Sequence, residues 1–176
     1  DWVSIPGGRE NIVKTSSDYS IIGGGFKNSI TSSMDATIGG GLHNGMYQAR
    51  YSSLFGGQAN VISGSKNSVL VGGEKNIMSS SVHDDQWNSI VGGYKARMIG
   101  CSWSFMGNSY SNGMTSSDSS ALVGGRENSI SSSEFAALVG GYLNTISATK
   151  YGFIGGGYNN GTTGQANAIV GGTNHQ

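Results

Sequence analysis

Residues 120–131 read SALVGGRENSIS, and residues 136–147 read AALVGGYLNTIS. The second stretch repeats the pattern of the first at a 16-residue offset: a small residue, an apolar triplet, a glycine pair, two variable residues, an asparagine and a second apolar residue. We call the asparagine the anchor of each copy. The anchors along the chain are Asn11, Asn28, Asn44, Asn60, Asn76, Asn112, Asn128, Asn144 and Asn160, with Ala96 and His175 at the same position in two departing copies.

The spacing of the anchors predicts a stacked repeat. The steps in residue number between successive anchors are 17, 16, 16, 16, 20, 16, 16, 16, 16 and 15, which gives eleven near-copies of one unit. The residue six before the anchor is apolar in every copy, and alternation of small and large residues around it has the period of a strand. A 16-residue unit cannot bury its own apolar face. We therefore expect an all-β chain, a parallel β-solenoid of about eleven coils, in a single domain of residues 1–176.

The glycine pair and the anchor asparagine predict a corner in each coil. Glycine accepts positive φ without a steric clash, and asparagine is the next most tolerant residue. Ten of the eleven copies keep the glycine pair, and Asn108-Ser109 replaces it once. We expect the asparagines to serve turn formation and a stacked amide ladder rather than a ligand.

The composition excludes several classes of protein. The chain has one proline among 176 residues, so it is not collagen-like, although it has 31 glycines. No apolar run approaches the roughly 20 residues of a membrane-spanning helix, and a net charge of zero argues against a nucleic-acid partner. The single cysteine, Cys101, permits no intrachain disulfide and is expected to be a small buried residue.

The first strand of each unit is often apolar at inward and outward positions alike, as in Ala121-Leu122-Val123 and Ala137-Leu138-Val139. The stretch from eight to three positions before the anchor contains no Asp, Glu, Lys or Arg in any copy. A strand that is apolar on both faces is usually buried on both. Because the repeat uses the whole chain, we expect other copies of the chain to cover the outer face, in a symmetric homo-oligomer.

Patterns such as Asn-Ser-Ile-Val-Gly-Gly and Ser-Ala-Leu-Val-Gly-Gly resemble the head repeats of trimeric autotransporter adhesins, the YadA-like heads, and repeats of phage and viral fibre proteins. The resemblance covers all eleven units and implies a left-handed β-roll, a homotrimer around one axis, and an extracellular place on a cell surface or virion fibre. The adhesin repeat is typically shorter than this 16-residue unit, so details of its turns do not carry over.

The longest step between anchors marks an insertion. It adds four residues within 79–87, and insertions in solenoids leave the coil as loops on one side. The candidate ligand-binding residues in this loop are His83, Asp84, Asp85 and Trp87. Three interpretations of this loop remain open: a solvated loop, a contact with a partner or glycan, and a metal site. Three adjacent residues rarely converge on one ion, so we assign no metal.

Aromatic residues form two rows at coil spacing. Successive residues of a strand point to opposite faces, so the row nine before the anchor lies on the outer face of the first strand. We therefore expect this row to pack between chains. The row two before the anchor lies at the glycine corner and is our better candidate for glycan contact. The first row is Trp2, Tyr19, Tyr51, Trp87, Trp103, Phe135 and Tyr151, and the second is Phe26, Tyr94, Tyr110, Tyr142 and Tyr158.

These patterns predict a structural and binding protein. We expect no enzyme activity, catalytic residue or cofactor: hexapeptide acyltransferases are solenoids built from six-residue units, and 16 is not a multiple of six. The function we expect is a trimeric adhesin head or fibre segment that binds a cell-surface receptor or glycan multivalently. The alternative is a self-assembling extracellular filament whose subunits stack end to end.

Overall fold

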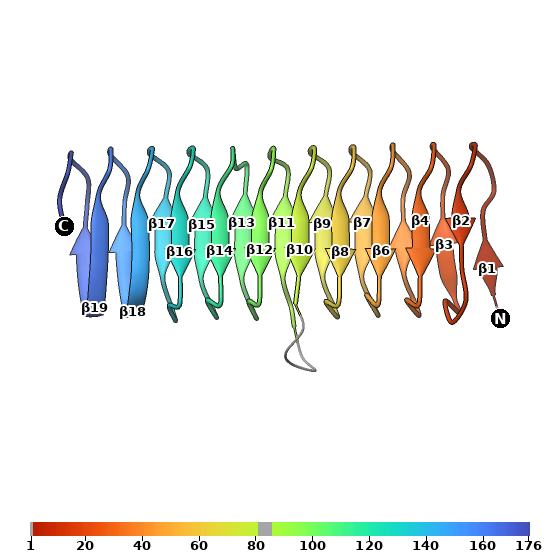
Figure 1. Cartoon of the computed structure of the whole chain (residues 1–176), viewed down its shortest axis with the longest axis horizontal. Helices are drawn as coiled ribbons and strands as arrows, with labels where there is room; N and C mark the ends of the chain where they lie inside the picture. The colour runs from red at the N-terminus through yellow and green to blue at the C-terminus, as the bar shows by residue number, and fades with distance from the viewer. Residues whose placement is uncertain (1, 81–85) are drawn as a thin grey trace.

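The computed structural model describes residues 2–80 and 86–176. These residues form short strands, turns and bends and contain no helix. The strands are stacked along one long axis with the chain ends at opposite ends of a rod (Figure 1). Across the same two ranges, no helical segment has the length and hydropathy needed to cross a bilayer.

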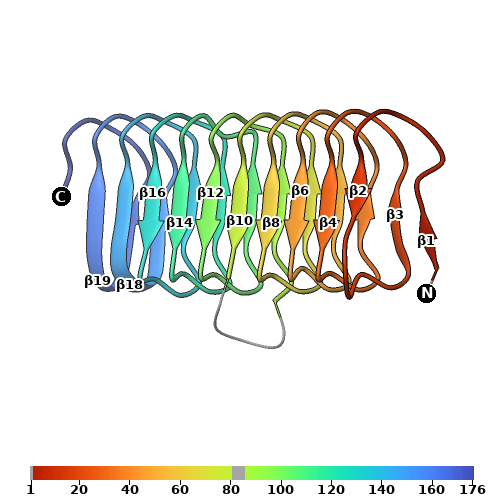
Figure 2. The same cartoon turned by 45° about the vertical axis from the view of Figure 1, so that its right-hand side comes forward.

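Each turn of the rod contributes one strand to each of two parallel sheets, which form two layers (Figure 2). The odd sheet contains β1 (Val3–Ser4), β3 (Ser20–Ile22), β5 (Thr37–Ile38), β7 (Ser53–Phe55), β9 (Val69–Val71), β11 (Ser89–Val91), β13 (Phe105–Gly107), β15 (Ala121–Val123) and β17 (Ala137–Val139). The even sheet contains β2 (Ile12–Val13), β4 (Ser29–Thr31), β6 (Gly45–Tyr47), β8 (Val61–Ser63), β10 (Ile77–Ser79), β12 (Arg97–Ile99), β14 (Gly113–Thr115) and β16 (Ser129–Ser131). The long strands β18 (Thr145–Ile154) and β19 (Gly161–Ile169) run through both sheets.

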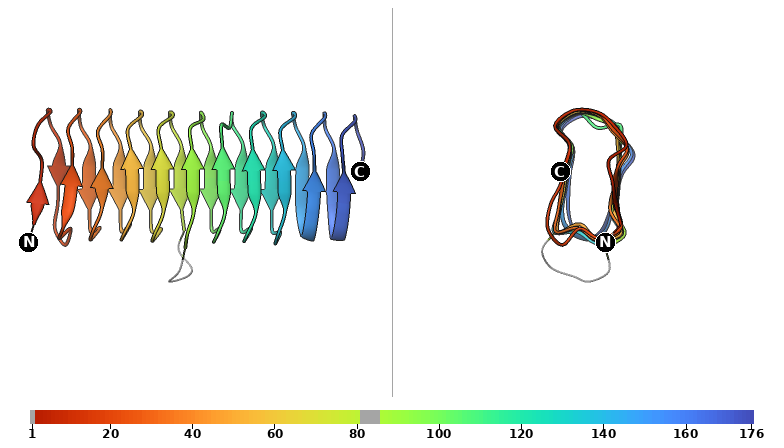
Figure 3. Two further views of the ribbon diagram at one scale, coloured as in Figure 1. Left: turned by 180° about the vertical axis from the view of Figure 1, so that it is seen from behind. Right: turned by 90° about the vertical axis from the view of Figure 1, so that its right-hand side faces the viewer.

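The strand register follows the sequence repeat. Ala121 pairs with Ala137 and Leu122 with Leu138, in each case the same position of the next unit, and all pairs of strands are parallel. The longest step is absorbed without loss of register, since Val69 pairs with Ser89 across it. The shortest step produces a one-residue register shift between Ser147 and Thr149, where β18 pairs with β19. The predicted all-β parallel solenoid is therefore confirmed, with about 10 turns. Viewed along the rod, the coils superpose on one narrow outline (Figure 3).

The core is a single row of side chains from each sheet. Leu122 of the odd sheet and Ile130 of the even sheet have no exposed surface, and their equivalents in the neighbouring coils are equally buried. Both positions are those that the repeat assigned to the interior. Burying one Leu or Ile side chain contributes about 2 kcal/mol, so the stability of the rod accumulates coil by coil.

The glycine corner differs from the prediction in one respect. The residue before the anchor takes positive φ, as Glu127 does at 53°, while no anchor asparagine has positive φ. The anchor side chain is instead buried and satisfies backbone groups. Asn128 Oδ1 accepts the Asn144 N–H at 2.9 Å, and Asn128 Nδ2 donates to the Gly141 carbonyl at 3.0 Å. The expected asparagine ladder is present, but its partners are mostly backbone atoms of the next coil.

Two departures from the repeat lie next to each other in space. An anchor amide donates to the carbonyl of the second glycine in the next unit, and the equivalent of that glycine for Ala96 is Ser109. Ala96 has no side-chain amide, although its backbone N–H still donates to Asn76 Oδ1 at 2.9 Å. Ser109 lacks the positive φ of the glycine and is buried. The missing asparagine and the missing glycine pair are therefore one local change, shared by adjacent coils.

The opposite corner, which we call the loop corner, joins each even strand to the next odd strand. Hydroxyl groups fill its interior: Ser104 Oγ accepts the Ser120 N–H at 3.2 Å, and Ser120 Oγ accepts the Ala136 N–H at 3.1 Å. Buried backbone N–H groups need such partners. Cys101 lies at this corner with no exposed surface, as the sequence predicted.

Candidate functional site

The outer faces of the two sheets differ sharply in apolar exposure. Among the described residues, Ile12 and Tyr47 are the exposed large hydrophobic side chains that project from the even sheet. The odd sheet and the aromatic row beside it carry most of the others, and we call this surface the apolar face. Its exposed members are Trp2, Tyr19, Ile21, Tyr51, Phe55, Val69, Val71, Trp87, Val91, Trp103, Phe105, Val123, Phe135, Val139, Tyr151, Phe153 and Val170.

The aromatic row nine before the anchor forms a rim along the apolar face. Trp87 and Trp103 lie one coil apart with ring centroids at 5.9 Å, and Phe135 stacks on Tyr151 at 5.6 Å. At the first coils, the rim and the odd sheet line a hollow of about 440 Å³, formed by Trp2, Val3, Ser4, Tyr19 and Ile21. This hollow shows that the rim and the strand side chains lie on the same side of the rod.

Phenylalanines of the apolar face lie over glycines. A methyl group placed on Gly107 would come within 3.0 Å of the Phe105 ring, and one on Gly155 would lie 3.5 Å from the Phe153 ring. The rings therefore cover gaps left by the glycines instead of standing away from the sheet. The strand side of the apolar face is uncharged, whereas Arg50 and Lys150 lie beside its rim, over the rings of Tyr51 and Tyr151. The uncharged strand side is suited to close contact with another ordered surface, because shape complementarity at interfaces approaches that of protein interiors.

A second exposed row runs along the glycine corner, two positions before the anchor. Tyr94 and Tyr110 lie with ring centroids 5.3 Å apart, and Tyr142 and Tyr158 lie 5.5 Å apart. Arg126 occupies the coil between the pairs, with its guanidinium carbon 5.2 Å from the Tyr110 ring and 5.4 Å from the Tyr142 ring. These five side chains form one continuous stack over five coils, which we call the ring ladder.

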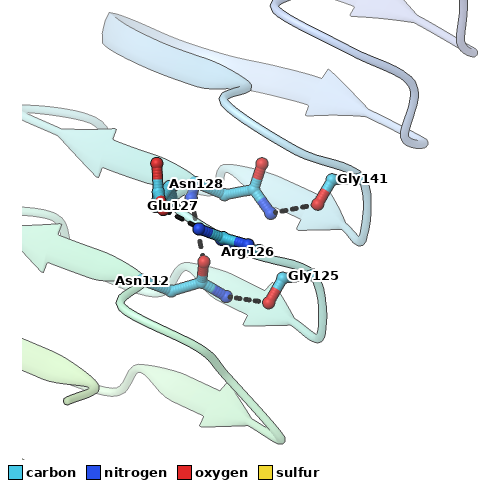
Figure 4. Close-up of polar contacts among 6 residues, drawn as sticks. All are labelled: Asn112, Gly125, Arg126, Glu127, Asn128 and Gly141. Atoms are coloured by element: carbon cyan, nitrogen blue, oxygen red, sulfur yellow. Dashed lines mark hydrogen bonds and ion pairs between the residues drawn. The ribbon is translucent and has the colours of Figure 1, made fainter. Parts of the chain in front are cut away.

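Arg126 is oriented by Glu127, its neighbour in sequence, and by the Tyr110 and Tyr142 rings of the two adjacent coils. Its Nε donates to Glu127 Oε1 at 2.9 Å, next to the asparagine ladder of Asn112 and Asn128 (Figure 4). The hydrogen bond and charge of Glu127 raise the pKa of Arg126, so the guanidinium is charged at any physiological pH. Its side chain is 59% exposed, which leaves the other N–H donors available to a ligand.

The predicted site residues fall on separate surfaces. Tyr94, Tyr110, Tyr142 and Tyr158 come together in the ring ladder, on the glycine corner as expected. Trp87 belongs to the rim of the apolar face, at the opposite corner of the coil. His83, Asp84 and Asp85 lie outside the described residues, so the interpretations of the inserted loop stay predictions. No cluster of three His, Cys, Asp or Glu residues suited to a metal ion occurs in residues 2–80 and 86–176.

Sequence reasoning missed Arg126 as a member of the ladder. The signal was present, because Arg126 occupies the same position relative to its anchor as the tyrosines do. A pattern defined by aromatic residues alone does not include a cation that stacks on the rings. Direct bridges between the backbones of Tyr110, Arg126 and Tyr142 hold the three side chains in line.

No protein-family model matches the chain, and a search of curated protein sequences gives no significant match.

Proposed function

We propose that the chain is a non-enzymatic attachment protein: a left-handed β-roll of about eleven 16-residue coils that forms a homotrimeric adhesin head or fibre segment outside the cell. The observation that carries the proposal is the difference between the outer faces of the two sheets. The resemblance of the repeats to YadA-like heads supports three copies around one axis.

The size of the apolar face supports contact between copies. About ten coils at roughly 4.8 Å per coil make it about 48 Å long, and a strand with its rim is roughly 15 Å wide. The face then offers on the order of 700 Å², near the roughly 800 Å² per partner of a stable interface. A copy of the same chain has the same coil spacing and the same uncharged odd strands, so its odd sheet matches the strand side of this face along the rod.

Three chains would also multiply weak contacts. Each copy presents the ring ladder, at the corner beside its odd sheet, to a cell-surface receptor or glycan. Several weak sites on one rigid body bind a multivalent surface with an avidity well above that of one site. A deep pocket is not required for attachment of this kind.

The test compares charge placed on the two outer faces. We expect Val91→Glu with Val123→Glu, on the odd sheet, to reduce the assembly to single chains, because unpaired carboxylates would be buried between copies. Thr115→Glu with Ser147→Glu, on the even sheet, is the matched control and should leave the mass of the assembly unchanged. Native mass is measured by light scattering, and circular dichroism confirms that both variants fold. Equal behaviour of the two variants would contradict the proposal.

A further inference from the structure

We propose that the ring ladder binds a linear anionic polysaccharide lying along the rod, with Arg126 as its central contact. This inference rests on the proposed attachment function and specifies the chemistry of the ligand.

The geometry of the ladder disfavours the stacking of neutral sugars. A sugar stacks on an aromatic residue through an open ring face, whereas the tyrosines in the ladder turn their faces toward one another, with interplanar angles of 34° and 38°. The Arg126 guanidinium covers the inner faces of Tyr110 and Tyr142. The groups that stay accessible to a ligand are the ring edges, the phenol hydroxyls and the guanidinium N–H groups. The hydroxyls and N–H groups bind hydroxyl and anionic oxygens.

The charge of the glycine corner favours an anion. Its charged residues, within four positions before the anchor, are the cations Arg9, Lys27, Lys75, Lys95 and Arg126 and the carboxylates Glu10, Glu74 and Glu127. All three carboxylates are ion-paired with cations of the same corner, at 2.8 to 3.4 Å. The corner therefore has an excess of positive charge although the whole chain is neutral.

The cations are also placed on the rings. Lys75 Nζ and Lys95 Nζ lie 5.5 Å and 5.0 Å from the Tyr94 ring centroid, at the end of the ladder. Cation–π contact holds each cation against the row, so that its charge is presented beside the phenol groups. At the loop corner the described charged residues give no positive excess: the carboxylates are Asp18, Asp35, Asp118 and Glu134, and the cations are Lys14, Arg50, Lys66 and Lys150.

The spacing suits a chain of sugars. Neighbouring members of the ladder lie 5.2 to 5.5 Å apart, close to the length of one pyranose unit. A polysaccharide along the rod would therefore place successive units opposite successive side chains. Acidic groups on the sugars would accept hydrogen bonds from the guanidinium, the strongest donor of the row.

The experiment measures binding of the assembled protein to dextran sulfate and to neutral dextran of equal length. We expect dextran sulfate to bind and dextran not to bind, with affinity that falls as salt is raised. Arg126→Gln should weaken binding to dextran sulfate about tenfold, and Arg126→Lys, which keeps the charge but loses the planar donor group, about threefold. The control is Lys150→Gln, which removes a cation 5.8 Å from the Tyr151 ring at the loop corner and should change nothing.

Three outcomes would overturn the inference: no binding of dextran sulfate by an intact assembly, equal losses from Arg126→Gln and Lys150→Gln, or equally tight binding of single-stranded DNA. The last outcome would show recognition of charge alone. Native mass is recorded for every variant. A protein found as single chains would contradict the attachment proposal, whereas an intact assembly that fails to bind would contradict this inference alone.

Discussion

The odd and even sheets share one backbone repeat and one core, yet their outer faces differ in the exposure of apolar side chains. Leu122 and Ile130 point into the same interior from the two sheets, and both are fully buried. On the outside, the odd strand β15 presents Val123, and the even strand β16 presents Ser129 and Ser131. The inward residues are sufficient to form a solenoid. The apolar outer face of the odd sheet is therefore an additional feature, and large exposed apolar surfaces on soluble proteins usually mark contacts with partners.

The largest expected effect separates the inside of a strand from its outside. Leu122→Asp should abolish folding, because burying a carboxylate without a partner costs more free energy than the packing of the surrounding coils provides. Ser131→Asp, on the outside of the even sheet, should cost less than about 1 kcal/mol. Chemical unfolding followed by circular dichroism measures both. Comparable damage from the two substitutions would show that the inward and outward assignments are wrong.

The next effect lies at the glycine corner, where the chain passes from the odd sheet to the even sheet. Gly124 and Gly125 have φ of 71° and 76°, so a side chain is strained at either position. A methyl group on Gly125 would also collide with the Asn128 amide and the Gly141 carbonyl, whereas one on Gly124 meets nothing within 4 Å. We expect Gly124→Ala to cost about 1 kcal/mol and Gly125→Ala at least about 3 kcal/mol. Unfolding midpoints that agree for the two variants would contradict the close contact between coils.

The loop corner, where the even sheet leads back to the odd sheet, gives a pH-dependent effect. Burial raises the pKa of the Cys101 thiol from 9.0 to about 11. Above pH 9 the unfolded chain therefore loses this proton before the folded chain does. The stability that the thiol contributes is complete below pH 9 and is lost between pH 9 and about 11, by about 2 kcal/mol.

This effect is measured by comparing the unfolding free energy of the wild type with that of Cys101→Ala from pH 8 to 11. The substitution should flatten the alkaline decline. A folded protein whose thiol reacts with iodoacetamide at pH 9 as quickly as the unfolded chain would count against burial of Cys101.

The smallest expected effect exchanges outward residues of nearly equal size. Val123→Thr on the odd sheet should weaken association by about 1 kcal/mol per chain, since it places a hydroxyl in an apolar contact. Thr115→Val on the even sheet should leave association unchanged. Dilution series followed by light scattering measure both midpoints of dissociation. A shift of similar size for Thr115→Val would remove the distinction between the two faces.

Much of the fold was predictable because its determinants are periodic. The 16-residue register, the inward rows and the corners followed from spacing, and the longest step was located from the anchors. The conformation of the corner was not predictable in detail. Positions such as Glu127 and Lys95 take positive φ although their side chains give no such signal. The stacked ladder of anchor asparagines was expected, but its backbone partners were not, because these are carbonyl and N–H groups of adjacent coils.

The candidate site was predictable only in part for a similar reason. The tyrosines of the glycine corner stand out as aromatic residues at coil spacing, but the link between their two pairs is Arg126, a residue of another chemical class. The distances that join them come from stacking of coils, which places side chains of one row in contact whatever their type.

The mass of the native protein in solution decides whether copies cover the apolar face. One chain has a mass of 18.1 kDa, and three copies give about 54 kDa. At concentrations above the midpoint of dissociation, light scattering should give the mass of three chains throughout. A single chain of 18.1 kDa with its odd sheet open to water would contradict the proposed assembly, and so would rods that lengthen as the concentration rises.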